Sequence, residues 1–246
     1  MAVAFDLATT SLNINAANKT FSHTVTGANP AIVVFAVLTG QTTTVSTITY
    51  AGASLAQIGT NLDFGVGGSI ARIVVFGLEN CATGANNVVV TLSASNAAWD
   101  TVAASFNGVA TSSAFSGFTS VTTVGASAAS LSRTVTTGAT GDMVVDGTGS
   151  TANNATTSTP GTQRWLDNSG ATNTRGATTP GGASVTVTEN WDLSNQNYGM
   201  VAFNVIQRAS QATTISTSWQ GIFQRASAFL IFIMEAARQV AKTLCL

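Results

Sequence analysis

The chain has 246 residues, long enough for one large domain or two small ones, each with a hydrophobic core. Hydrophobic residues make up 45% of it but charged residues only 8%, where an average soluble domain has about 25%. So little charge is typical of membrane proteins and of β-rich proteins with Ser, Thr, Asn and Gly on their surfaces. No apolar run, Ala228–Met234 and residues 31–38 included, approaches the ~18 residues that span a bilayer. The composition therefore favours the β-rich class and predicts no transmembrane segment.

The charges are unevenly distributed along the chain. Residues 1–207 contain nine acidic and five basic residues, whereas residues 208–246 contain four basic residues and one acidic residue. The basic residues form neither a run nor a stripe, so we expect no nucleic-acid binding.

In the first half, residues 5–19 are rich in Ser and Asn and predict a loop. Residues 31–38 are continuously apolar and β-branched, which is typical of a strand buried on both faces. Residues 61–69 form a Gly-rich loop without the GK[ST] sequence of a phosphate-binding loop. Period-two alternation and turn residues predict strands at 20–25, 31–38, 45–50, 54–58, 70–78, 87–92 and 99–106.

The two cysteines, Cys81 and Cys245, lie far apart in the sequence and form no CxxC spacing. We expect two free thiols, with an intermolecular disulfide through Cys245 as the open alternative.

In the second half, strands are predicted at 118–124, 130–135, 142–147, 163–165, 183–191 and 199–206. Residues 148–159 and 167–182 predict long loops, and the last two strands are expected to pair. About a dozen short strands without helical periodicity predict a mainly β fold, an antiparallel β-sandwich over residues 1–207.

Several segments resemble those of a known group of domains. The segments are Thr20–Gly27, Val45–Leu55, Ala71-Arg72, Val88–Leu92, Ser105–Val109, Gly141–Asp146, Gln163–Trp165 and Ala183–Val187. Together they resemble the jelly-roll domains of tailed-phage structural proteins and large bacterial surface proteins, over about residues 4–207. The resemblance implies a lectin-like jelly roll in a surface or virion setting, and it implies no site residues.

The C-terminal residues have a different pattern. Residues 208–218 are expected to be a linker, and residues 219–246 show a heptad repeat that predicts an apolar C-terminal α-helix for anchoring or oligomerisation. Its predicted assembly residues are Trp219, Phe223, Leu230, Ile233, Val240 and Leu244. Three uses are open: a seam between copies, docking on this subunit or a neighbouring virion protein, and lying on a membrane surface.

Titratable residues offer few candidates for chemistry. His23 is the only histidine and is expected on the surface of a strand. Asp142 and Asp146 flank a strand and are expected to face water on one side of it, with a calcium or glycan site as the open alternative. The sequence therefore predicts no catalytic residues, no metal site and no cofactor.

Aromatic residues on β-sandwiches can stack on sugars. Trp165, Trp191 and Tyr198 are the candidate glycan-binding residues, although core packing is the favoured interpretation of each tryptophan.

No basic segment followed by an apolar stretch opens the chain, so the sequence predicts no Sec signal peptide. With a surface-type composition, this indicates a virion component released by lysis, and a chain trimmed of its signal would look the same. We therefore expect a non-enzymatic virion structural protein of a tailed phage: a capsid decoration, fibre or tail-associated subunit. Its expected partners are its own copies and other virion proteins. The alternative is an extracellular carbohydrate-binding or adhesive module for cell-surface glycans.

Overall fold

The computed structural model describes residues 1–67, 69–123, 130–136, 138–151, 156–167, 172–191 and 197–209. Residues 1–209 form one compact unit, called the first unit below, and the fold described is that of this unit.

The first half of this unit forms one antiparallel sheet of eight strands. They run in the order β4-β3-β8-β2-β7-β5, with β1 paired to β8 and β6 paired to β7. Their bounds are β1 Ala4–Val25, β2 Ala31–Thr39, β3 Val45–Tyr50, β4 Ala53–Ser54, β5 Ala56–Gln57, β6 Leu62–Val66, β7 Ser69–Glu79 and β8 Gly84–Asn107.

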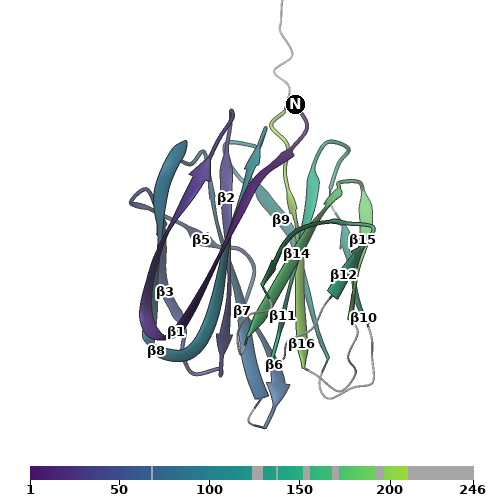
Figure 1. The fold of residues 1–246 in the computed structure, drawn as a ribbon. Helices are drawn as coiled ribbons and strands as arrows, with labels where there is room; N and C mark the ends of the chain where they lie inside the picture. Colours follow the sequence, from purple (N-terminus) through teal and green to yellow (C-terminus); the bar gives the residue numbers. More distant parts are fainter. Residues whose placement is uncertain are drawn as a thin grey trace, which may run out of the picture. The chain divides into compact units, whose positions relative to one another are not determined.

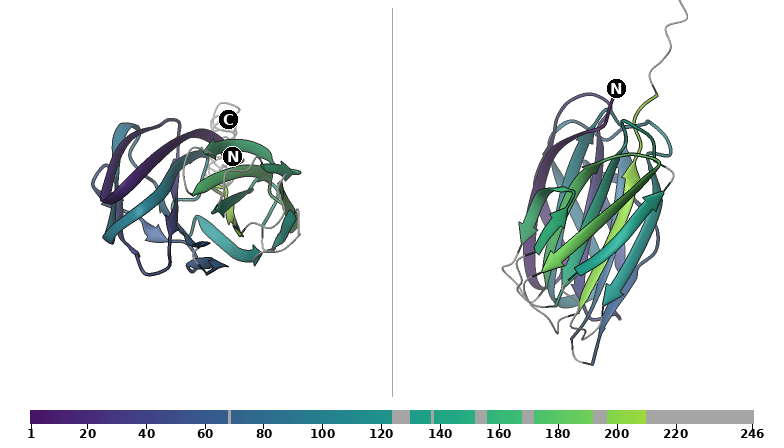
Figure 2. Two further views of the ribbon diagram at one scale, coloured as in Figure 1. Left: turned by 60° about the horizontal axis from the view of Figure 1, so that its bottom comes forward. Right: turned by 90° about the vertical axis from the view of Figure 1, so that its right-hand side faces the viewer.

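The second half forms two further antiparallel sheets, which lie beside the first half in Figures 1 and 2. The five-stranded sheet has the order β13-β14-β11-β16-β9, and the three-stranded sheet the order β10-β15-β12. Their bounds are β9 Phe115–Thr123, β10 Ser130–Thr136, β11 Met143–Ser150, β12 Thr156–Thr159, β13 Thr162–Asp167, β14 Asn173–Pro180, β15 Ser184–Trp191 and β16 Tyr198–Val205.

The central strand β2 is buried on both faces, as its apolar sequence predicts. Because side chains alternate along a strand, Val33 and Phe35 point to one core while Val34 and Leu38 point to another. The first core joins the two halves of the unit, and the second lies within the eight-stranded sheet.

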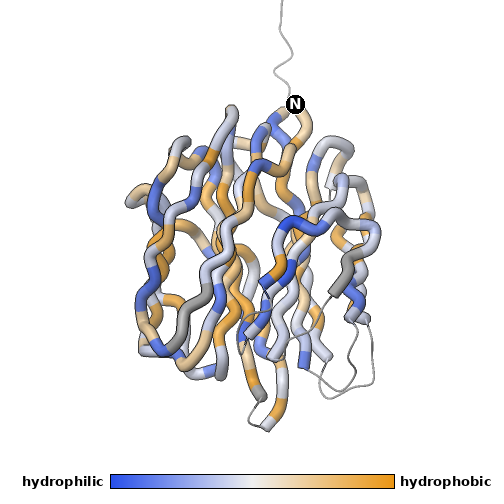
Figure 3. Tube along the Cα trace, in the orientation of Figure 1, coloured by the Kyte–Doolittle hydropathy of each residue, from blue (hydrophilic) through white to orange (hydrophobic). Residues whose placement is uncertain are grey.

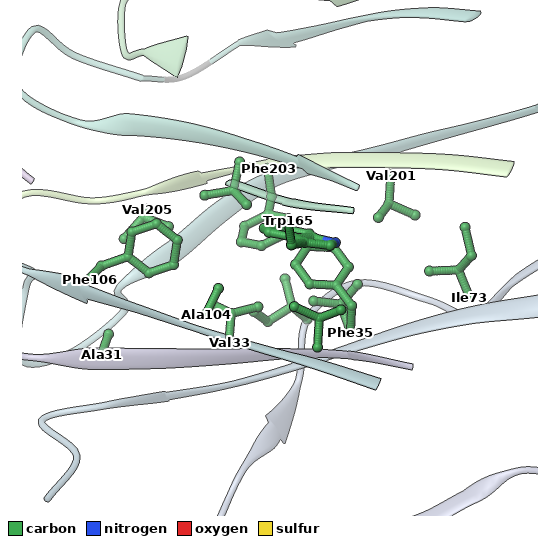
Figure 4. Close-up of a cluster of buried hydrophobic side chains, with 14 of the residues drawn as sticks. Ala31, Val33, Phe35, Ile73, Ala104, Phe106, Trp165, Val201, Phe203 and Val205 are labelled. Atoms are coloured by element: carbon green, nitrogen blue, oxygen red, sulfur yellow. The ribbon is translucent and has the colours of Figure 1, made fainter. Parts of the chain in front are cut away.

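Aromatic rings fill the core between the halves (Figure 4). Phe35 on β2 lies 5.0 Å from Trp165 on β13 and 6.0 Å from Phe203 on β16, measured between ring centroids. Gly147 on β11 makes room for Phe35, because an added Cβ would come within 2.5 Å of its ring. This packing fixes the five-stranded sheet against β2, β7 and β8.

The long strands β1 and β8 bend together, which folds the eight-stranded sheet over on itself (Figure 1). Their register shifts between Ala16 and Asn18, and Asn15 has a positive φ of 50°. Before the bend, residues 88–92 of β8 pair with β3, and after it residues 99–106 pair with β2. The folded-over part covers the second face of β2 with residues such as Val90 and Ile48.

A third core lies between the five-stranded and three-stranded sheets. It contains Val144, Met200 and Ala202 from the former and Leu131 and Val187 from the latter. Figure 3 shows apolar and polar residues mixed along these strands, and β10 and β15 of the three-stranded sheet have the alternating burial of strands with one buried face.

The structure corrects the predicted fold class. It is mainly β, and the residues that it describes contain no helix, so the predicted jelly-roll-like sandwich with a C-terminal α-helix is wrong as stated. Instead of one pair of sheets around one core, three sheets enclose three cores, because the largest sheet bends over itself. An antiparallel β-sandwich architecture is the part of the prediction that holds.

Several element predictions are also corrected. Residues 5–19 are not a loop but belong to β1, and the predicted strands 87–92 and 99–106 are one strand, β8. The predicted loop 167–182 contains β14, a buried strand between β11 and β13. Strands β15 and β16 do not pair with each other, because they lie in different sheets.

Candidate functional site

A surface pocket of about 330 Å³ lies where the two halves of the unit meet. One side consists of β5, the residues that follow it and the end of β7, and the other side consists of the start of β9 and the loop before it. Both β5 and β9 are edge strands of their sheets. An edge strand has no neighbour on its outer side within its sheet. The pocket therefore lies between the free edges of two sheets and not inside a core.

Two phenylalanine rings of β9 line the pocket, each seated against a glycine of the opposite side. A Cβ at Gly77 would lie 2.5 Å from the ring of Phe115, and a Cβ at Gly59 would overlap the ring of Phe118. Gly59 also has a φ of +68°, a conformation that side chains disfavour. Phe115 is held further by an edge-to-face contact with Phe203 in the core, at 6.3 Å between centroids. Both rings are half-buried, so each remains partly open to the pocket.

Polar groups surround these rings. Gln57, Glu79, Ser113 and Ser116 all line the pocket. The Gln57 amide Nε2 donates to Asn61 Oδ1 at 2.8 Å, which orients the amide while leaving its carbonyl oxygen able to accept. The pocket thus combines apolar ring surface with hydroxyl, amide and carboxylate groups, the usual composition of a small-ligand site.

The backbone at Ser113 is unusual. Its φ is +52°, in the left-handed region that residues other than Gly, Asn and Asp seldom occupy. Such conformations cost about 1–3 kcal/mol and concentrate at functional sites. Here the turn places Ser113 at the pocket, directly before the β9 residues that line it.

The predicted glycan-binding residues lie in the interior. Trp165 is 4% exposed in the core between the halves, and Trp191 and Tyr198 are 4% and 1% exposed in the third core. The Trp191 and Tyr198 rings stack on each other at 3.7 Å between centroids. The favoured interpretation of the tryptophans as core residues is confirmed, and a sugar could stack on these rings only if the core opened.

The predicted assembly residues Trp219, Phe223, Leu230, Ile233, Val240 and Leu244 lie outside the described residues, as does Cys245. Cys81 is a free, buried cysteine, and burial raises the pKa of its thiol to about 11.

His23 was predicted on the surface of a strand, but its side chain is buried and only 1% exposed. Its Nδ1 lies 2.9 Å from Thr9 Oγ1, and its ring meets Tyr50 edge to face. Burial lowers its pKa to about 4 although nearby Asp6 opposes the shift. The histidine is therefore neutral at pH 7 and packed inside the folded-over sheet.

The prediction that Asp142 and Asp146 face water is wrong, because both are buried. The Asp142 carboxylate accepts hydrogen bonds from the backbone N–H groups of Ala139 and Gln207, each at 2.8 Å. It thereby joins the start of β11 to the segment after β16 and acts as a structural cap.

Lys19 and Asp100 are buried near the bend of β1 and β8. The Lys19 Nζ lies 4.5 Å from the Trp99 ring centroid and donates to the carbonyl oxygens of Ser11 and Trp99. Burial lowers the pKa of Lys19 to about 8, while burial and the charge of Asp167 raise the pKa of Asp100 to about 7. Lys19 and Asp100 therefore lie inside the packed unit, and the Lys19 contacts with Ser11 and Trp99 stabilise the bend.

Most charged side chains of the described residues are turned inward. Eight are buried, namely Lys19, Arg72, Asp100, Asp142, Asp146, Asp167, Arg175 and Glu189. Five are half-buried, namely Asp6, Glu79, Arg133, Arg164 and Arg208. Asp63 is the one exposed member of the described set, and it pairs with Arg72 through two hydrogen bonds of 2.5 and 2.9 Å. Among the described residues, charged side chains therefore reach the surface at Asp63 and, in part, at these five half-buried positions, and the other exposed side chains are uncharged.

Within the described ranges, no three His, Cys, Asp or Glu side chains come together as metal ligands. The part of the chain that the structure describes contains no helix long and apolar enough to cross a membrane.

The comparisons with known proteins add no relative. No family model matches the chain, and searches of curated proteins and of solved structures give no match. What is shown is therefore an antiparallel, sandwich-like β fold, while the resemblance to phage and surface jelly rolls stays a prediction.

The local sequence pattern did not point to the residues of the pocket. Phe115 and Phe118 stand in a Ser- and Gly-rich segment, Ser113–Phe118, whose sparse aromatic residues were the available signal. Their partners Gly59 and Gly77 lie about forty residues or more away in the sequence, so only the sheet packing brings the two sides together.

Proposed function

We propose that this chain is a non-enzymatic structural protein of a virion, a capsid decoration, fibre or tail-associated subunit that packs against its own copies and other virion proteins. The observation that supports this proposal most directly is the scarcity of fully exposed charge among the described residues of the first unit. Asp63 is the one charged side chain of this set that is exposed, and it pairs with Arg72.

The physical reason is electrostatic. Charged surfaces keep proteins apart, because copies of the same net charge repel each other and charged groups must lose water at a contact. Hydroxyl and amide groups lose water at a smaller cost and can form hydrogen bonds with a neighbouring subunit. On the three-stranded sheet, for example, Thr134 Oγ1 lies 2.8 Å from Thr186 Oγ1 and Ser132 Oγ 2.7 Å from Thr188 Oγ1 on exposed positions. Such a face suits dense packing of many copies.

The proposal is tested by locating the protein. Particles purified from lysates of cells that carry the gene would be probed by quantitative mass spectrometry and by immunogold labelling. We expect many copies per particle, with label on the capsid or tail. Finding the chain only in the soluble fraction or on the cell envelope would contradict the proposal.

Self-association of the purified chain supplies a second test. Because few exposed charges are available, we expect sedimentation coefficients that rise with protein concentration and change little with salt. A matched pair of variants, Thr186→Lys and Thr186→Asn, separates charge from shape at an exposed position of β15. Association that the lysine variant weakens and the asparagine variant preserves supports contacts through this sheet.

A further inference from the structure

We propose that the pocket formed by Gln57, Gly59, Gly77, Glu79, Ser113 and Ser116 with the rings of Phe115 and Phe118 binds a neutral pyranose, such as the terminal sugar of a glycan. This site goes beyond the proposed structural function and does not depend on it. A virion subunit could pack into a particle whether or not this pocket is filled.

The two rings supply the apolar part of the site. One face of a pyranose presents C–H groups, which pack on an aromatic ring while the hydroxyl groups point outward. Phe115 and Phe118 are half-buried, so each ring has a fixed side, against the protein, and an open side. Gly77 and Gly59 set these positions, because any larger residue would displace the rings. The stacking surface is thus formed before a ligand arrives, which lowers the entropic cost of binding.

The polar groups match hydroxyls rather than a charged ligand. The Ser113 and Ser116 hydroxyls can donate and accept, and the oriented Gln57 amide offers a carbonyl oxygen and an N–H. The Glu79 carboxylate can accept from two neighbouring hydroxyls. The hydroxyl groups of a sugar both donate and accept hydrogen bonds, so they can pair with the serine hydroxyls, the Gln57 amide and the Glu79 carboxylate.

Charge and size narrow the choice of sugar. Among the described residues, Glu79 is the only charged one that lines the pocket, and none of those that line it is basic. A carboxylate at the site repels acidic sugars such as sialic or uronic acids. A volume of about 330 Å³ lies at the small end of ligand pockets, which fits one sugar residue rather than a long oligosaccharide.

Neutral monosaccharides serve as the probes: galactose, glucose, mannose and N-acetylglucosamine, each titrated into the full chain by NMR with sialic acid as a comparison. We expect saturable shifts for at least one neutral sugar, confined to residues of the pocket, and none for sialic acid. No saturable binding of any of the four sugars at millimolar concentration would overturn the proposal. Shifts that map to another surface would overturn it as well.

Variants separate the site from the fold. Phe118→Ala removes one ring and Gln57→Ala removes a polar partner on an exposed strand, and we expect each to weaken binding at least tenfold. Leu166→Ala, at an exposed residue of β13, is the matched control and should bind as the parent does. If Phe118→Ala fails to fold, Gln57→Ala decides, because its exposed side chain contributes little to packing. Unchanged affinity in Gln57→Ala would overturn the assignment.

Glu79→Gln tests the basis of selectivity. It keeps the shape of the side chain while removing the charge, so we expect sialic acid to gain measurable binding and the neutral sugar to bind within a few-fold of the parent. Continued exclusion of sialic acid would contradict the role given to the Glu79 charge.

Discussion

The guanidinium of Arg175 on β14 donates to the carboxylate of Glu189 on β15, across the interior between the five-stranded and three-stranded sheets. Both side chains are buried, and Arg175 Nε also donates to Gln163 Oε1 at 3.3 Å. The pair lies at the edge of the third core and connects two sheets that share no backbone ladder.

We expect Glu189→Gln to destabilise the fold by about 3–5 kcal/mol, because it leaves the buried Arg175 charge without its anion. The double variant Arg175→Met with Glu189→Leu should cost much less than the sum of the single variants, because it removes both charges. Urea denaturation gives the free energies of unfolding. Additive costs would show that the two residues act independently.

Gly176 on β14 is predicted to be intolerant of any side chain. An added Cβ would overlap Cζ2 of Trp165, whose indole packs directly over this position. Gly176→Ala should therefore lower the free energy of unfolding by about 1–3 kcal/mol through overpacking. Gly182→Ala is the matched control, since its nearest contact would be an ordinary 3.6 Å. Equal thermal midpoints for the two variants would refute this account.

Because His23 is buried in its neutral form, we expect the fold to lose stability in acid. Its pKa is about 4 in the folded chain, below the ordinary value of 6.5, so the unfolded chain binds the proton more tightly. Its contribution is fully present above pH 6.5 and is lost as the pH falls towards 4, by about 3 kcal/mol in total. His23→Gln should remove this part of the pH dependence in urea titrations at pH 4 to 7. An unchanged slope would mean that His23 does not titrate as described.

For the buried Asp100, we expect the stability of the fold to change with pH in the opposite direction. Burial raises its pKa to about 7, so the folded chain holds the proton more tightly than the unfolded chain. Stability should therefore fall as the pH rises from about 4 to 7, by at most about 4 kcal/mol. Asp100→Asn keeps the shape without the charge and should unfold at higher urea than the parent at pH 8, with little difference at pH 4. Comparison with His23→Gln separates the two effects.

Much of the strand content was predictable from local pattern. The run 31–38 became the doubly buried β2, Val45–Tyr50 became β3 with the same bounds, and the strand predicted to end at residue 106 ends at Asn107, before Gly108 with its φ of +71°. These predictions hold because they depend on side-chain alternation and on turn conformations that only glycine adopts readily.

Strand β14 shows why other elements were missed. Its sequence, Asn173–Pro180, is polar and rich in Thr and Gly, which is typical of a loop. Yet β11 and β13 pair with its two edges, so its backbone groups are satisfied in the interior, and its small residues leave space for Trp165. Pairing with strands distant in the sequence therefore outweighed the low β-propensity of the β14 residues.

By itself, the sequence determined that the fold is mainly β, because low charge, β-branched runs and frequent turn residues allow little besides antiparallel sheets. Only the tertiary structure decided which faces are inside, which is why His23, Asp142 and Asp146 were misplaced and why the ring pocket of Phe115 and Phe118 was not foreseen. The physical reason is that burial and pocket shape depend on how a bent sheet and two further sheets stack. That stacking joins residues far apart in the chain, and no local periodicity records it.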